Sequence, residues 1–334
     1  MAKRMFVMTV IFVLTVSAAF AGGRRASSAS GGSETIKIGC IVFQEDMFMQ
    51  MYTMGCVAAA KDAGVEINTA NSNNDAAQEA NLINTYTEQG YKGVVMQTPD
   101  DVTALQTIKV ANGKGVQFVI GSILSDEASK YVLTSILTSN ESLGYLSGEA
   151  AVRYIKEKAI SPVNVAVVQF KAQSSFYSNL RSSSFLKALD DGGIKYNLVA
   201  DQDAWMMDTA ITTATDILTA HPEVNIIYGA NDGATVGSTM AVKNLGLVNK
   251  VSVFGCDASA QICNLLLDPS YSLVATAAQD AYRVGYDCTQ TLIKGIKGED
   301  ISAVKGKTVE INAMPLNDYD SAAVRKYLEE ISKY

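Results

Sequence analysis

Histidine and tryptophan are almost missing from this sequence of 334 residues, because each occurs only once, as His221 and Trp205. His221 precedes Pro222 at the end of a predicted helix, where a role at the helix terminus is expected rather than catalysis. No G-x-S-x-G, G-x-G-x-x-G or phosphate-loop motif follows a predicted strand. The sequence therefore predicts neither an enzyme nor a cofactor.

Basic clusters are also scarce, and the formal net charge is −7. Nucleic-acid-binding proteins normally concentrate Lys and Arg on one face, and outside the first 25 residues this sequence has no such concentration. We therefore expect no nucleic-acid partner. An acidic chain of this kind fits a small neutral ligand.

Long apolar runs are limited to the N-terminus, where residues 5–20 follow Lys3 and Arg4 and end in Ala19-Phe20-Ala21. This pattern predicts a secretory signal peptide over 1–21, cleaved near Ala21. A single-pass anchor is the alternative, but the run is shorter than the ~20 residues that a membrane-spanning helix needs. Residues 22–33 are small and polar, which predicts a flexible leader. No cysteine follows the apolar run, so a lipid anchor is not expected.

The cysteines number five and show no C-x-x-C spacing, which argues against a zinc site. An odd count in an exported chain permits at most two internal disulfides. We expect mostly buried thiols, while a pairing of Cys256 with Cys263 stays open. The five are Cys40, Cys56, Cys256, Cys263 and Cys288.

Short β-branched runs alternate with helical stretches from residue 35 onward, and they are apolar without clean alternation. This pattern predicts parallel sheets that are covered by helices on both faces. The predicted strands are 35–42, 65–70, 93–97, 116–121, 131–137, 163–170, 194–200, 224–230 and 251–258. The predicted helices are 48–63, 76–89, 101–112, 144–158 and 178–190. The repeated pattern predicts an α/β fold of two doubly wound, parallel-sheet lobes.

Ligands of such sheets bind beyond the carboxyl ends of the strands, which directs attention to the polar and aromatic residues there. Phe48 and Trp205 could cover the apolar faces of a sugar ring, while carboxylates, amides and Arg bond its hydroxyls. The residues at these positions also have structural interpretations. Phe48 could be a core aromatic, and so could Trp205, although its polar surroundings make a core role less obvious. Asn231-Asp232 could be a helix N-cap, and Asp257 a turn residue.

Five segments resemble the periplasmic ribose-binding and galactose/glucose-binding proteins, in order and over nearly the whole mature chain. They are EDMFM (45–49), the stretch from Asp203 through Trp205 to LTAHPEV, IIYGAND (226–232), VFGCDA (253–258) and ATAAQD (275–280). EDMFM and DAWMMDTA favour the galactose/glucose branch. The resemblance implies the type I periplasmic binding protein fold, in which a multi-strand hinge joins the two lobes. It implies 34–138 and 280–308 in one lobe and 139–279 and 309–334 in the other.

The same resemblance implies the roles of individual residues. Asp46 would bind sugar hydroxyls, and Phe48 and Trp205 would stack on the ring. The full implied ligand-binding set is Asp46, Phe48, Met49, Ser122, Ser175, Tyr177, Asn179, Arg181, Trp205, Asn231, Asp257 and Gln279. The sequence departs from the galactose/glucose pattern before Arg181, where Ser175, Phe176 and Tyr177 replace a His and an Asp, and after the fourth strand, where Ser122 stands. The calcium loop of some relatives has no counterpart, so we expect no structural metal.

The resemblance implies an exported monomer that captures a monosaccharide, such as galactose or glucose, between two lobes in the periplasm and delivers it to an ABC-type membrane permease. A pentose, a polyol or another small polar ligand is the alternative. A sensor role at a chemoreceptor or histidine kinase also stays open. A transcription regulator shares the fold, but the signal peptide and the lack of a helix-turn-helix argue against it. Asp46 and Asp257 could imitate a glycosidase pair, an interpretation that release of product from a glycoside would support.

Overall fold

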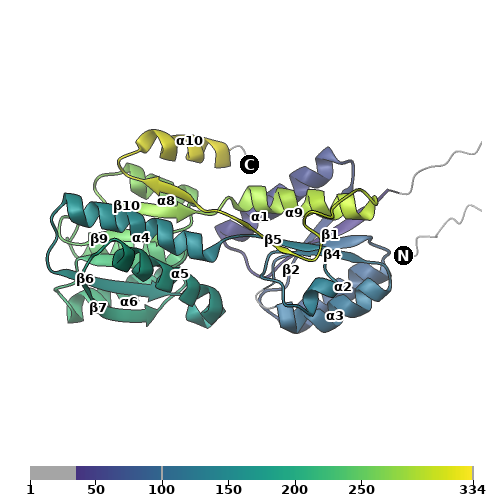
Figure 1. The fold of residues 1–334 in the computed structure, drawn as a ribbon, viewed down its shortest axis with the longest axis horizontal. Coiled ribbons are helices and arrows are strands. Elements are labelled where there is room, and N and C mark those ends of the chain that lie inside the picture. The colour runs from purple at the N-terminus through teal and green to yellow at the C-terminus, as the bar shows by residue number, and fades with distance from the viewer. Residues whose placement is uncertain (1–34, 99–100, 333–334) are drawn as a thin grey trace, which may run out of the picture. The chain divides into compact units, whose positions relative to one another are not determined.

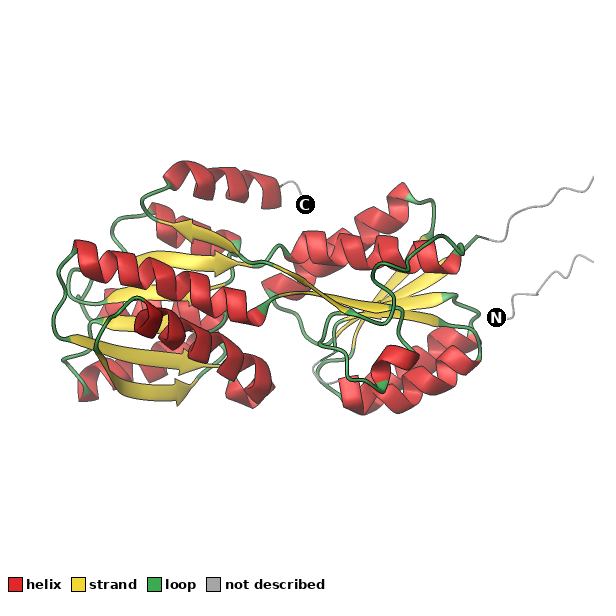
Figure 2. Cartoon of the chain, in the orientation of Figure 1, coloured by secondary structure: helices red, strands yellow, loops and turns green. Residues whose placement is uncertain are grey.

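The computed structural model describes residues 35–98 and 101–332, in which strands and helices alternate (Figure 2). The predicted signal peptide and leader lie outside the described residues. Among the helices that are described, none is both long and apolar enough to cross a membrane.

Six strands form a first sheet in which every pairing is parallel, in the order β2-β1-β3-β4-β5-β11. Its inner strands are buried on both faces, as their continuous apolar runs predict. The strands are β1 (Lys37–Val42), β2 (Glu66–Asn71), β3 (Gly93–Met96), β4 (Gln117–Ile120), β5 (Thr134–Thr138) and β11 (Thr308–Ile311).

A second sheet has the order β7-β6-β8-β9-β10-β12. Its pairings are parallel except at the edge, where β12 runs antiparallel to β10. The prediction of parallel sheets is therefore confirmed for every strand but this one. The strands are β6 (Val163–Gln169), β7 (Tyr196–Asp203), β8 (Ile226–Gly229), β9 (Ser252–Cys256), β10 (Leu273–Ala278) and β12 (Met314–Asn317).

Helices cover both faces of the first sheet (Figure 1). One face packs against α1 (Met47–Asp62) and α9 (Ala281–Ile296), which contact each other. The opposite face packs against α2 (Ala76–Glu88) and α3 (Asp101–Gly113). A short 3₁₀ helix, η1 (Ala128–Lys130), lies between β4 and β5. A core on each face of one sheet is what the doubly wound pattern predicts.

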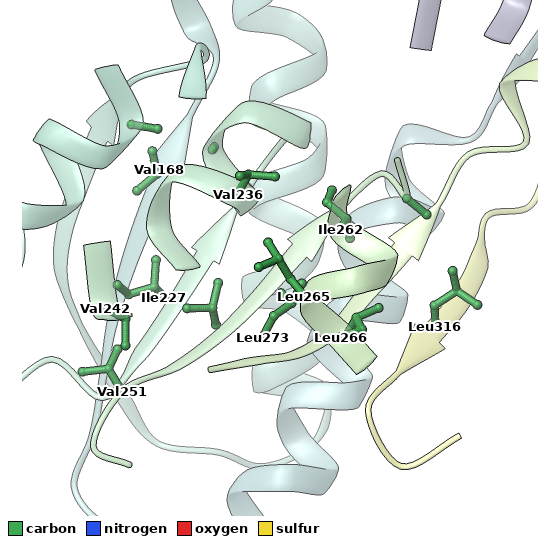
Figure 3. Packing of buried hydrophobic residues seen from close by; sticks show 14 of the residues in the cluster. Val168, Ile227, Val236, Val242, Val251, Ile262, Leu265, Leu266, Leu273 and Leu316 are labelled. Atoms are coloured by element: carbon green, nitrogen blue, oxygen red, sulfur yellow. The ribbon is translucent and has the colours of Figure 1, made fainter. Parts of the chain in front are cut away.

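The second sheet is covered in the same way. The paired helices α4 (Asn140–Glu157) and α5 (Lys171–Asp191) pack on one face. The other face is covered by α6 (Met207–Ala220), α7 (Asp232–Asn244), α8 (Ala260–Leu267) and α10 (Ser321–Ile331). Figure 3 shows this second core, where Val168 and Ile227 of the sheet meet Val236 of α7 and Leu265 of α8.

The chain passes between the two sheets three times. It leaves the first sheet after β5 to form α4 on the second, returns after β10 to form α9 on the first, and leaves again between β11 and β12. The sequence placed the last boundary at 308/309, inside a strand that pairs with β5 over Thr308 to Ile311. The third passage therefore falls between Ile311 and Met314. Three connecting segments between the sheets are compatible with the predicted multi-strand hinge.

Two predicted helices begin earlier than expected, and the structure gives the reasons. Helix α4 begins at Asn140 because the Ser139 side chain accepts a hydrogen bond from the Ser142 backbone N–H (3.4 Å). Helix α5 begins at Lys171 but is interrupted at Ser174, where φ is −154° and ψ is 103°. The sequence located only the longer part that follows this interruption.

All five cysteines are buried free thiols, and Cys256 and Cys263 are not paired with each other. Burial raises the pKa of the Cys256 thiol to about 12, so the thiol stays protonated near neutral pH. The expectation of buried thiols is confirmed.

Candidate functional site

A cavity of about 140 Å³ lies at the carboxyl ends of strands from both sheets. It is lined by side chains that directly follow β1, β3, β8, β9 and β10. We call it the main cavity. Its lining includes Gln44, Asp46, Phe48, Gln97, Thr98, Asn140, Phe170, Gln173, Tyr177, Arg181, Asn231, Asp232, Asp257, Gln279 and Tyr327. Strand ends are where the fold places ligands.

Asp257 is the centre of the polar network on the second-sheet side. Its carboxylate accepts hydrogen bonds from the Gln279 side-chain amide (2.6 Å) and the Asp232 backbone N–H (2.9 Å). The Arg181 guanidinium lies 3.7 Å from the same carboxylate. Asp257 has a φ of 71°, a conformation that Asp adopts more readily than most residues. A strained backbone at a polar, buried carboxylate is common at ligand sites.

Arg181 is held in place by groups other than Asp257. Its Nε donates to the Asn140 side-chain oxygen (2.8 Å), and its Nη1 donates to the Ala230 carbonyl (3.0 Å). The guanidinium carbon lies 4.9 Å from the centre of the Phe170 ring. Helix α4 approaches closely here, because a Cβ on Gly144 would lie 1.9 Å from the Arg181 carbonyl oxygen. The guanidinium is thus preorganised to donate its remaining N–H groups into the cavity.

Asn231 and Asp232 begin α7. The Asn231 side-chain oxygen accepts from the Ala234 backbone N–H (3.0 Å), and its amide nitrogen donates to the Trp205 carbonyl (2.9 Å). The N-cap interpretation of this pair is therefore correct for Asn231, which also lines the cavity. Burial, and then the nearby carboxylates of Asp257 and Asp46, raise the pKa of Asp232 to about 6.

Asp46 is the N-cap of α1, where its side chain accepts from the Met49 backbone N–H (2.8 Å). The Gln44 amide donates to its other oxygen. Burial raises the pKa of Asp46 above its usual value, although these two hydrogen bonds oppose the shift. Asp257, from the other sheet, adds to the rise, so the two carboxylates lie close enough to affect each other across the cavity.

The aromatic residues of the cavity differ in part from those predicted. Phe48 and Tyr177 line it, as does Phe170, which the sequence assigned to the end of a strand. The Trp205 ring does not reach the cavity and packs instead against the core beneath α4 and α5. Phe170 directly follows β6, so its position at a strand end could have identified it as a lining residue.

Three other predicted ligand residues lie outside the cavity lining. Ser122 is buried, and its carbonyl accepts from the Ser135 hydroxyl. Ser175 is exposed, because it falls beside the interruption in α5. Asn179 lines a separate surface hollow together with Phe176. The structure brings together Asp46, Phe48, Met49, Tyr177, Arg181, Asn231, Asp257 and Gln279.

Several lining residues were not predicted. Gln97 and Thr98 follow β3, so the strand-end rule could have identified them. Tyr327 comes from the last helix and donates to the Gln279 carbonyl (3.1 Å). Its sequence neighbours give no signal of this role, because only the packing of α10 brings it to the cavity.

Comparison with known proteins gives the family. The model of the periplasmic binding protein domain matches residues 40–300. The ribose import binding protein RbsB of Escherichia coli is 26% identical over 290 residues, which cover 86% of this chain and 94% of that protein. The ABC transporter periplasmic-binding protein YphF of Escherichia coli is 23% identical over 71% of this chain and 73% of its own length.

Solved structures show the same fold. A solute-binding protein of an ABC transporter from Actinobacillus succinogenes, with bound D-allose, matches with a TM-score of 0.77 and 19% identity over 86% of this chain and 100% of that chain. A similar protein from Bacillus halodurans, with bound myo-inositol, also has a TM-score of 0.77, with 17% identity over 90% of this chain and 100% of its own. Two parallel-dominated sheets, a cavity between their strand ends and a family match over residues 40–300 show that this chain belongs to the periplasmic binding proteins, which bind solutes and are not enzymes.

Proposed function

We propose that this protein captures a monosaccharide in the main cavity and delivers it to an ABC-type importer. The cavity itself carries the proposal, because it combines aromatic side chains with carboxylate, amide and guanidinium groups in one small space. Aromatic rings cover the apolar faces of a sugar, and the polar groups bond its hydroxyls. Relatives named for ribose and D-allose binding support this ligand class.

The charges of the cavity favour an uncharged ligand over an anionic one. Among the residues that the structure describes, three carboxylates line the cavity, Asp46, Asp232 and Asp257, against the one guanidinium of Arg181. Arg181 already lies 3.7 Å from Asp257 and donates to Asn140 and Ala230. Because Arg181 is paired with Asp257, an anion would be repelled by Asp46 and Asp232 with no further described cation in the lining to offset them. We therefore propose a neutral sugar, with a hexose such as galactose or glucose as the first candidate.

We propose further that each sheet with its helices forms one lobe, and that the ligand closes the lobes by contacting both. Asp46 and Phe48 lie at the start of α1, which packs on the first sheet. Arg181 lies in α5, on the second sheet, while Asp257 and Gln279 follow the second-sheet strands β9 and β10. A ligand shifts such an equilibrium only by its difference in affinity for the two forms. In this proposal, the protein is exported to the periplasm, and the closed form meets the permease. A sensor partner remains the second candidate for the same closed form.

Calorimetric titration of the mature chain, from Gly22 onward, tests the proposal. The panel contains glucose, galactose, allose, ribose, arabinose, xylose and myo-inositol, with glucuronate as the anionic comparison. We expect saturable binding of one neutral sugar per chain and weaker binding of the anion. No binding across the panel would reject a sugar ligand. Release of a product from an aryl glycoside would instead support an enzyme.

A further inference from the structure

We propose that residues 171–177, at the start of α5, form a latch that joins the strand ends of the two sheets over the main cavity. Gln173 and Tyr177 are its two contact points. This inference rests on the proposed function, since a latch matters only if the cavity closes on a ligand. Both residues act as positioning residues for closure.

Each contact point reaches a loop of the first sheet. The Gln173 side-chain amide donates to the Gln44 side-chain oxygen (2.7 Å), in the loop after β1. The Tyr177 hydroxyl accepts from the Ile123 backbone N–H (3.0 Å), in the loop after β4. In the order of the first sheet, β3 lies between β4 and β1. The latch therefore bridges the strand ends on both sides of β3.

The latch is fixed to its own sheet by the end of β7. The Lys171 ammonium lies 3.2 Å from the Asp201 carboxylate, and the Ala172 backbone N–H donates to the Asp203 carboxylate (3.1 Å). These contacts hold the first turn of α5 while Gln173 extends away from it. A segment that is tied to one sheet and bonded to the other resists separation of the two.

The two contact points are four residues apart, on either side of the interruption at Ser174. Residues at this spacing share a face of a regular helix, so the interruption is not what turns both side chains toward the first sheet. Ser174 leaves the helical conformation, and its hydroxyl accepts from the Tyr177 backbone N–H (3.5 Å) to begin the next turn. Both contact residues also line the main cavity.

One half of the latch is connected directly to a ligand group. Gln173 donates to Gln44, and Gln44 in turn donates to Asp46, which caps α1 and lines the cavity. Hydrogen bonds in such a chain polarise and strengthen each other. A ligand hydroxyl that donates to Asp46 would therefore complete a chain that spans both sheets.

A double-mutant cycle on ligand affinity tests the Gln173 contact. We expect Gln44→Ala and Gln173→Ala each to raise the Kd of the bound sugar ~3- to ~10-fold, mainly through faster dissociation. The double variant should be hardly weaker than Gln44→Ala alone, because Gln173 acts through Gln44, which also donates to Asp46. Gln202→Ala, at an exposed position of β7, is the matched control and should leave the Kd unchanged. Additive losses, or no loss, would overturn the Gln173 contact.

Hydrogen exchange of the Ile123 amide tests the Tyr177 contact without any ligand. We expect Tyr177→Phe, which removes only the accepting hydroxyl, to speed exchange at Ile123 several-fold relative to the wild type. Equal exchange in both proteins would overturn this contact. If no sugar binds while Ile123 exchange responds to Tyr177→Phe, the proposed sugar ligand fails and the latch stands.

Discussion

Asp257 is the carboxylate that connects the polar groups on the second-sheet side of the main cavity. It accepts from the Gln279 amide and the Asp232 backbone, and it lies beside the Arg181 guanidinium. Hydrogen bonds to charged groups contribute more than neutral ones, and a buried guanidinium that loses its partner is left with an uncompensated charge. Loss of this carboxylate would remove the acceptor of Gln279 and leave Arg181, which Asn140 and Ala230 also hold, without its counter-charge.

We expect Asp257→Asn to raise the Kd of the bound sugar ~10- to ~100-fold, because it removes the negative charge that lies beside Arg181 and accepts from Gln279. Asparagine tolerates the positive φ at this position, so the backbone should be kept. Calorimetry measures the change, with Asp216→Asn at an exposed position of α6 as the control. An unchanged Kd would remove Asp257 from the site.

Asp232 should make the stability of the protein depend on pH. Its pKa in the folded protein is about 6, above the usual ~3.9 of an unfolded aspartate, so the folded state binds the proton more tightly. The resulting stabilisation is fully present below pH ~4 and is lost as the pH rises through about 6. We expect Asp232→Asn to exceed the wild type in free energy of unfolding by more at pH 7.5 than at pH 4.5.

Urea unfolding at the two pH values measures this difference. Asp46 also has a raised pKa, but it is present in both proteins, so comparing the variant with the wild type isolates Asp232. If the variant differs from the wild type equally at both pH values, Asp232 does not titrate in this range.

At the scale of the elements, the crossing of α1 and α9 holds one side of the cavity in place. A Cβ on Gly55 would lie 2.0 Å from the Tyr282 carbonyl oxygen, and one on Gly285 would lie 2.1 Å from the Tyr52 carbonyl oxygen. The two helices thus meet backbone to backbone, which only glycine permits. Helix α1 presents Asp46 and Phe48 to the cavity from its first turn.

We expect Gly55→Ala to lower the free energy of unfolding by ~1–3 kcal/mol, because the added methyl group must push α1 and α9 apart. Thermal or urea unfolding measures the loss. Gly113→Ala is the control, since no atom lies within 4 Å of its added Cβ, and higher helix propensity should make it neutral or stabilising by up to ~1 kcal/mol. Equal effects of the two changes would show that α1 and α9 can separate freely.

At the scale of the whole molecule, the chain passes between the two sheets three times, and the proposed sugar would bind in the cavity at their strand ends. A ligand that binds only the folded protein stabilises it by mass action. We expect the sugar identified by titration to raise the free energy of unfolding by ~2.7 kcal/mol at a hundred times its Kd. Urea unfolding with and without the sugar measures this, and a sugar that does not bind in calorimetry is the control. A smaller gain would show that the sugar also binds the unfolded chain.

Much of the fold could be predicted because strands and helices depend on patterns of apolar residues over short stretches of sequence. Apolar β-branched runs predicted the strands β1 to β9, but not β10 or β11, and their lack of alternation predicted parallel sheets with helices on both faces. The edge strand β12 escaped this rule, since MPLN is short and carries a proline. The boundary at 308/309 was misplaced because a strand of four residues, TVEI, gives little sign of which sheet it joins.

The candidate site was predicted where position follows from the fold alone. Residues that directly follow a strand, such as Asp46, Asn231 and Asp257, lie at the cavity because parallel strands bring their carboxyl ends together. Nearness to a strand end did not place every side chain. Trp205 lies two residues after β7 but is half-buried and packs against the core beneath α4 and α5. Ser175 is exposed beside a break in α5 that no residue pattern indicates.

By itself, the sequence determined the alternation of strands and helices, the buried thiols and the residues at the strand ends, because propensity, apolar patterning and strand direction act over short distances. Only the tertiary structure decided which aromatic rings face the cavity, how Gln173 and Tyr177 reach the other sheet, and why Tyr327 joins the site. Those outcomes depend on how whole helices pack and where they break, which contacts between distant parts of the chain determine.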